Sequence, residues 1–226
     1  MMNVNPLKFP ETTIVNKVVP KTAFYRYMDV NAKLKQHLID DVEKIVWLYK
    51  LSPKTINVED GQSVHEITVF DVVLKGDDCS DELLEFIDKN MPRHIIFLLR
   101  HDDQCRLLVN YKEWIDEKKG TFSITKTFKT PWLNNNDVTL TVEGFTLDRV
   151  YDSFVATISG LKPSNTQDLA KVVEFKTQVE ELMKRISQLQ KRIKNEIQFN
   201  RKVELNNQRK ELVKELHAIE EQLKNL

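Results

Sequence analysis

Residues 164–226 contain no glycine, proline or tryptophan, whereas all 5 Gly, all 7 Pro and all 3 Trp lie at or before Pro163. Glu, Lys, Gln and Leu dominate this last segment, and these residues are good helix formers. The preceding stretch, residues 160–165, combines a glycine, a proline and small polar residues, which interrupt regular structure. We therefore predict a globular domain over residues 1–160, a linker over 161–165 and a coiled-coil helical region over 166–226.

Apolar residues in the helical region recur in alternating steps of three and four, which is the spacing of a coiled-coil seam. The first series consists of Val172, Phe175, Val179, Leu182, Ile186, Leu189 and Ile193. The second series has a shifted phase and consists of Leu205, Leu212, Leu216, Ile219, Leu223 and Leu226. One long helix with a discontinuity and an antiparallel helical hairpin both fit this pattern. We favour the hairpin, because two arms of comparable length can bury each other's seam without a second chain.

Residues 1–160 combine short helical patterns with β-branched and continuously apolar runs. The helices are predicted at 21–28, 30–39, 81–90 and 147–158, and the strands at 44–51, 64–74, 95–99, 106–112, 121–129 and 138–142. Most strands are joined by hairpins, and helices stand between pairs of them. This order predicts an α+β fold with an antiparallel or mixed sheet and helices mainly on one side.

The composition excludes several classes of protein. Lys plus Arg and Asp plus Glu number 34 each, so the chain is neither a generally basic nucleic-acid coat nor a polyacidic tail. Cys79 and Cys105 are the only cysteines and have no metal-site spacing, which predicts buried thiols in a reducing cytoplasm and no metal. No apolar run approaches the roughly 20 residues of a membrane span, and no Gly-rich loop suggests a cofactor phosphate. We expect a cytoplasmic protein without a cofactor.

The residues themselves indicate no reaction. A nuclease of the restriction type needs an acid-x-Lys triplet, and the nearest candidate ends at Lys75 with Val73, which cannot bind a hard cation, in the acidic position. We interpret Asp71, just before it, as a surface or edge-strand acid. The five histidines lie in separate predicted elements, so no catalytic residue is assigned.

Two groups of residues are candidates for binding. The first consists of polar groups beside a large aromatic in a loop-rich region, and its members are Asn16, Lys17, Lys21, Trp47, Lys50, Thr55 and Asn57. The same residues fit structural roles, as turn residues and a core tryptophan, at least as well.

The second group lies where the seam changes phase. Its members, candidates for contact with nucleic acid or a partner protein, are Lys184, Arg185, Lys191, Arg192, Lys194, Phe199, Asn200, Arg201 and Lys202. Seven of them are basic, and within 184–202 only Glu196 opposes them, a local net charge of +6. The alternative interpretation is a solvated face whose Lys and Arg pair with Glu on the other arm.

Several short motifs resemble a prokaryotic family known as domain of unknown function 4391. They are Phe9-Pro10-x-x-Thr13, Asn16-Lys17-x-x-Pro20-Lys21, Trp47-x-x-Lys50-Leu51-Ser52-Pro53-x-Thr55-Ile56-Asn57, Tyr111-Lys112, Thr130-Pro131-Trp132, and the run from Gln198 to Asn206. The resemblance spans nearly the whole chain. It implies a bacterial or archaeal cytoplasmic protein, often encoded beside helicases and DNA methyltransferases in restriction-like or phage-defence loci, and it implies no reaction.

The leading hypothesis is a non-enzymatic accessory subunit that docks through its coiled coil on a helicase, on a methyltransferase or on its own copy. The alternative is an enzyme, either a degenerate nuclease or a small-molecule enzyme built around Lys17, Lys21, Lys50 and Thr55.

Overall fold

The computed structural model describes residues 6–116, 121–161 and 166–224, and the chain divides into two compact units, Met1–Lys162 and Pro163–Leu226. Residues 162–165 of the predicted linker, and residues 225–226 of the predicted helical region, lie outside the described residues. The helices are η1 (Glu11–Thr13), α1 (Lys21–Tyr27), α2 (Ala32–Asp40), α3 (Pro53–Ile56), α4 (Asp81–Lys89), α5 (Leu147–Ser159), α6 (Thr166–Asn195) and α7 (Phe199–Lys224). The strands are β1 (Ile14–Val19), β2 (Val42–Leu51), β3 (Ile67–Leu74), β4 (His94–His101), β5 (Gln104–Asp116), β6 (Thr121–Lys129) and β7 (Leu133–Asn134).

The first unit is built on a mixed sheet of seven strands in the order β1-β2-β3-β4-β5-β6, with β7 also paired to β5. All neighbours are antiparallel except β3 and β4, which run parallel because α4 carries the chain from the end of one strand to the start of the next. A hairpin joins β4 and β5, with His101 opposite Gln104. The α+β prediction with a mixed sheet is thus confirmed.

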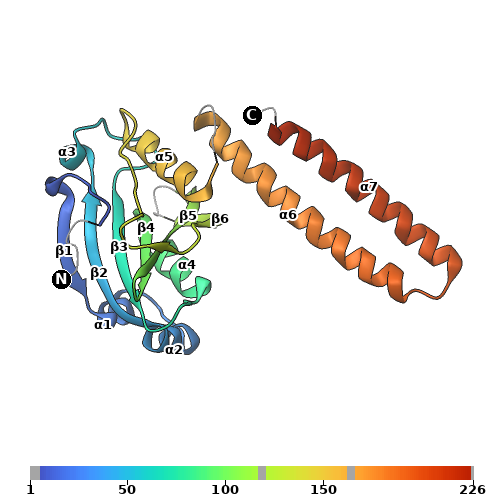
Figure 1. The fold of residues 1–226 in the computed structure, drawn as a ribbon, viewed down its shortest axis with the longest axis horizontal. Helices are drawn as coiled ribbons and strands as arrows, with labels where there is room; N and C mark the ends of the chain where they lie inside the picture. Colours follow the sequence, from blue (N-terminus) through green and yellow to red (C-terminus); the bar gives the residue numbers. More distant parts are fainter. Residues whose placement is uncertain (1–5, 117–120, 162–165, 225–226) are drawn as a thin grey trace. The chain divides into compact units, whose positions relative to one another are not determined.

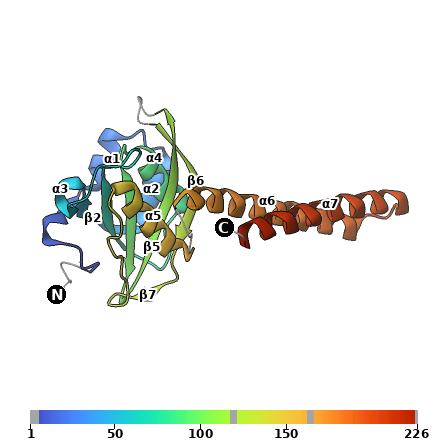
Figure 2. The same ribbon diagram turned by 90° about the horizontal axis from the view of Figure 1, so that it is seen from above.

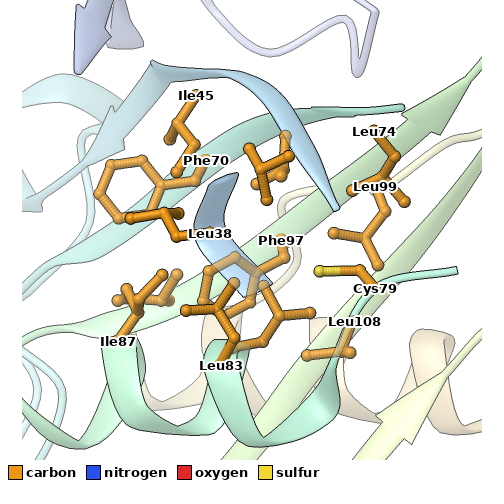
Figure 3. Packing of buried hydrophobic residues seen from close by; sticks show 14 of the residues in the cluster. Leu38, Ile45, Phe70, Leu74, Cys79, Leu83, Ile87, Phe97, Leu99 and Leu108 are labelled. Atoms are coloured by element: carbon orange, nitrogen blue, oxygen red, sulfur yellow. The ribbon is translucent and has the colours of Figure 1, made fainter. Parts of the chain in front are cut away.

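Alternating residues of the central strands fill a core on each face of the sheet. On one face, Phe97 of β4 packs with Phe70 of β3 and with Leu83 and Ile87 of α4 (Figure 3). Helices α1 and α2 cover the same face, whereas α5 contacts β5 and β6 from the other side (Figure 1). Most helices therefore lie on one side, as predicted, and the continuously apolar β4 is covered on both faces.

Some local predictions were wrong, for reasons that the sheet makes clear. Residues 138–142 form no strand, although Val138 and Leu140 are buried as the alternating pattern predicts, because this segment pairs with no strand of the sheet. Strand β1 was not predicted, since Asn16 has a positive φ of 49° and breaks the apolar pattern at a bulge. Helix α2 begins at Ala32 and not at the predicted residue 30, because the Asn31 side chain caps it by accepting a hydrogen bond from Leu34 N at 2.9 Å.

The second unit is a hairpin of two long helices, α6 and α7, which lie side by side in both ribbon views (Figures 1 and 2). The predicted hairpin is confirmed, and the single long helix is wrong. The turn contains neither glycine nor proline. Instead Glu196 Oε1 accepts hydrogen bonds from the backbone N–H groups of Ile197 and Gln198, both at 2.9 Å, so a side chain satisfies the backbone where α6 ends.

The seam holds the two helices together along one side only. Val172, Leu182, Ile186 and Leu205 are buried, while the remaining apolar seam residues within the described part of the hairpin are half-buried. A two-helix hairpin has no further layer to cover its seam. The C-terminal hairpin, meaning α6, α7 and their turn, therefore keeps partly accessible apolar surface. No helix in the described residues is long and apolar enough to cross a membrane.

We predict that replacing Leu182 and Leu216 by Asp unfolds the hairpin without changing the molecular mass in solution. Leu182 is only 4% exposed, and removing a buried leucine costs about 2–5 kcal/mol even before a charge is introduced. Circular dichroism at 222 nm should show the loss of helix, and light scattering should show a constant mass.

The matched control places the same two aspartates one position away, at Met183, which is 56% exposed, and at exposed Glu215. This double variant should keep its helicity, because exposed substitutions change stability little. A wild-type dimer that becomes a monomer on Leu182→Asp and Leu216→Asp would instead mean that the seam joins two chains.

Candidate functional site

The seven residues of the first candidate group are spread along the sheet. Asn16 and Lys17 lie on β1, Lys21 begins α1, Trp47 and Lys50 lie on β2, Thr55 lies in α3 and Asn57 follows it. Lys21 Nζ donates to the carbonyl of Val42, the first residue of β2, whereas Lys50 stands near the other end of that strand. Eight residues of strand span about 26 Å. The structure therefore does not gather these side chains into one site.

Trp47 and Lys50 do belong to one polar cluster at the end of β2. Lys50 Nζ lies 2.7 Å from Glu66 Oε2, and Arg93 Nη1 lies 3.0 Å from Glu66 Oε1. The Arg93 guanidinium also stands 5.5 Å from the centre of the Trp47 ring. Lys50 and Arg93 thus share one carboxylate partner, Glu66. The cluster joins the end of β2 to the segments just before β3 and β4.

Local backbone structure explains the positions of Thr55, Asn57 and Asn16. Thr55 Oγ1 accepts from Ser52 N at 2.8 Å in a capping box at the start of α3, and Asn57 closes that helix in the left-handed region with φ of 54°. Asn16 adopts a similar φ at the β1 bulge. Local chain geometry accounts for these residues as fully as a binding role does.

Sequence reasoning missed a buried ion pair between α4 and β5. Lys112 Nζ lies 2.7 Å from Asp88 Oδ1, and both side chains are 0% exposed. The same ammonium donates to the carbonyls of Asp88, Met91 and Arg93, which lie at the C-terminal end of α4, where the helix dipole favours a cation. Asn110 Nδ2 donates to Asp88 Oδ2 at 2.9 Å. Lys112 therefore fixes α4 to the sheet.

Burial sets the protonation of this network. It raises the pKa of Asp88 to about 6, although Lys112 acts in the opposite direction. Burial also lowers the pKa of His94 to about 3, and the Lys112 charge adds to that effect. His94 packs edge-on against Tyr151, with ring centres 4.5 Å apart. Shifted pKa values often mark catalytic sites, but Asp88, Lys112 and His94 are buried and are surrounded by other parts of the protein.

A second ion pair corrects the interpretation of Asp71 as a surface acid. Asp71 is buried on β3, and Arg100 of the parallel neighbour β4 holds it with two hydrogen bonds, one of them from Nε to Oδ1 at 2.7 Å. Burial raises the pKa of Asp71, and Arg100 opposes this shift. Arg100 and Cys105 line a hollow of about 430 Å³ at this end of the sheet. No group of three or more His, Cys, Asp and Glu suited to a metal occurs among the described residues.

The second candidate group lies entirely on the C-terminal hairpin, and its members are all exposed. Lys191, Arg192 and Arg201, from both helices, surround a hollow of about 430 Å³ beside the turn, whose other lining residues are Asn195, Glu196, Gln198 and Leu205. We call this the tip hollow. The structure thus brings together residues that are ten positions apart in the sequence, and the turn is what brings them together.

A second hollow runs between the helices further from the turn. It measures about 480 Å³ and is lined by Arg185, Gln188, Leu189 and Arg192 of α6 and by Gln208, Glu211 and Leu212 of α7. The α6 residues are spaced at i, i+3, i+4 and i+7, so they share one helix face. We call this the side groove. Its leucines are half-buried seam residues, which makes its floor apolar and its rim polar.

Comparison with known proteins identifies one family. The model of the family described as domain of unknown function (DUF4391) matches residues 7–216. No curated protein and no solved structure matches the chain.

We predict that Lys112→Met destabilises the protein by about 3–5 kcal/mol, because it leaves the Asp88 carboxylate buried without a cation. Chemical denaturation of the variant measures this loss. Adding Asp88→Asn, which removes the charge and keeps an acceptor for Asn110, should restore at least half of it.

Lys129→Met is the matched control, since it breaks an exposed ion pair with Asp81 and should cost at most about 1 kcal/mol. Equal effects of Lys112→Met and Lys129→Met would contradict the structural importance of the buried pair.

Proposed function

The chain belongs to the DUF4391 family, and from that premise we propose that it is a non-enzymatic accessory subunit of a prokaryotic DNA restriction or phage-defence system. In this proposal the C-terminal hairpin docks on a helicase or a DNA methyltransferase of that system. The partner class follows from the genomic setting that the sequence resemblance implies. The docking element follows from the geometry of the hairpin.

The side groove is the observation that carries the proposal. Its floor, Leu189 and Leu212, remains accessible because two helices cannot enclose their seam. A third helix with an apolar stripe would complete the packing, as in other helix-in-groove complexes. Arg185 and Arg192 on the rim favour a partner helix with acidic residues beside that stripe.

The placement of the polar residues supports an interaction role over catalysis. The alternative enzyme site around Lys17, Lys21, Lys50 and Thr55 would need side chains that converge, and these lie on four different elements, β1, α1, β2 and α3. Lys50 is paired with Glu66, and the Thr55 hydroxyl is engaged in the capping box. The most strongly buried charges, Asp88 and Lys112, have no access to a substrate.

The test is purification of the tagged full-length chain from cells that encode it, with quantification of the retained helicase and methyltransferase chains by mass spectrometry. The double variant Arg185→Glu, Gln208→Glu alters exposed residues of the side groove and should retain at least tenfold less partner. Both residues are exposed, so hairpin helicity should stay unchanged.

The matched control is Ser187→Glu, Lys210→Glu, which makes the same change of three charge units at exposed positions that do not line the side groove. It should retain the partner as the wild type does. Equal retention by both double variants, or a wild-type preparation that holds neither a helicase nor a methyltransferase, would refute the proposal.

A further inference from the structure

Charge is unevenly distributed along the C-terminal hairpin. Within 184–202, beside the turn, seven basic residues stand against one acidic residue, a net charge of +6. Within 170–181 and 211–223, far from the turn, three basic residues stand against seven acidic ones, a net charge of −4. A solubilising face would mix the two signs along its length, so this pattern marks the turn end as a surface for an anion.

The acidic residues of the hairpin do not neutralise the turn end. Lys214 pairs with Glu211 at 2.8 Å and His217 contacts Glu220 at 3.3 Å, both in α7 and away from the turn. Of the seven basic residues at the turn end, Arg201 alone has an ion-pair partner within the described part of the chain, Glu196 at 3.6 Å. Glu196 Oε1 is already engaged by two backbone N–H groups. The cations at the turn are therefore available to an external anion.

The donors around the tip hollow suit phosphate oxygens. Lys191 and Arg192 come from α6 and Arg201 from α7, and the lining also includes the side-chain amides of Asn195 and Gln198, the Glu196 carboxylate and Leu205. Ammonium, guanidinium and amide N–H groups are the donors that proteins use for nucleic-acid backbones. Because the donors come from both helices, their arrangement depends on the closed hairpin.

Two large apolar side chains are exposed to solvent at the same turn. Ile197 is 95% exposed and Phe199 is 77% exposed. An exposed aromatic ring among cations is the arrangement with which proteins hold single strands, whose unpaired bases stack on the ring while the phosphates meet Lys and Arg. A duplex keeps its bases stacked inside and offers no free base to Phe199, so the aromatic ring selects a single strand.

We propose that the turn end of the hairpin binds single-stranded nucleic acid, with Lys191, Arg192 and Arg201 on the phosphates and Phe199 stacked on a base. This site goes beyond the proposed docking of a partner helix, because it lies at the turn and uses phosphate chemistry. It gives the accessory subunit its own contact with a strand that a helicase exposes.

The test is fluorescence anisotropy of a labelled 20-nucleotide oligo(dT) titrated with the full-length chain at 20–200 mM NaCl. Three phosphate contacts on a single strand predict a log-log salt slope of about −2, or binding about 20-fold weaker at 200 mM than at 50 mM. A parallel titration with oligo(rU) shows whether the protein prefers single-stranded DNA or RNA. Tight binding of either oligonucleotide supports the proposal.

The charge variant Lys191→Glu, Arg192→Glu, Arg201→Glu reverses the three proposed phosphate contacts, all of them exposed, and should weaken binding at least 30-fold while helicity is kept, since Glu is a good helix former. Lys171→Glu, Lys176→Glu, Lys214→Glu makes the same charge change within 170–181 and 211–223, far from the turn, and should stay within about threefold of the wild type. Equal losses in the two variants would mean that only overall charge matters, and would overturn the proposal.

Phe199→Ala tests the stacking itself. It should weaken oligo(dT) binding about 5- to 150-fold and change binding of a 20-base-pair duplex less than twofold, whereas Phe199→Tyr and Ile197→Ala should bind like the wild type. An unchanged affinity of Phe199→Ala for oligo(dT) would overturn the assignment of a single-strand site.

Absence of binding to oligo(dT) and oligo(rU) at 20 mM NaCl, where electrostatic attraction is least screened, would also overturn the proposal. The basic turn end would then be expected to bind an acidic surface of a partner protein instead. Failure of the nucleic-acid proposal can be distinguished from failure of the docking proposal. The groove variant Gln188→Ala, Gln208→Ala changes two residues that line the side groove and leaves the charge of the turn end unaltered, so it should bind oligo(dT) within about threefold of the wild type even where it loses its protein partner.

Discussion

The apolar seam between α6 and α7 is the contact on which both proposed binding surfaces of this protein depend. Leu182, Ile186 and Leu205 are buried in it, and the turn after Asn195 directs α7 back along α6. If the seam did not close within one chain, the tip hollow and the side groove would not exist, because each is lined by residues of both helices. The same seam, being open to one side, supplies the apolar floor for a partner.

The globular unit uses its charged residues to hold the fold together. Lys112 and Asp88 fix α4 to β5, Arg100 and Asp71 join the only parallel pair of strands described, and Glu66 bridges Lys50 and Arg93. Each of these pairs connects elements that are distant in sequence. Charges engaged in this way are unavailable to a substrate, whereas those at the turn of the hairpin are exposed and mostly unpaired. This contrast favours an interaction role for the hairpin.

Features set by local pattern could be predicted from the sequence, and features set by distant contacts could not. The period of the leucine seam predicted the hairpin, and the apolar run 95–99 predicted a central strand. Lys112 has the sequence context of an ordinary strand lysine, so only the fold reveals that it meets Asp88. Residues 138–142 alternate as a strand does, and Val138 and Leu140 are buried accordingly, but alternation alone does not show whether a segment pairs with a neighbouring strand.

The claim that the hairpin closes within one chain is tested most directly by cross-linking α6 to α7. Gln188 and Gln208 line the same side groove and are exposed, so Gln188→Cys with Gln208→Cys places two accessible thiols near each other, while native Cys79 and Cys105 are buried. A short bifunctional thiol reagent, applied at low protein concentration, should give a product with the mass of one chain on a denaturing gel. A product with the mass of two chains would contradict the intramolecular hairpin and both surfaces inferred from it.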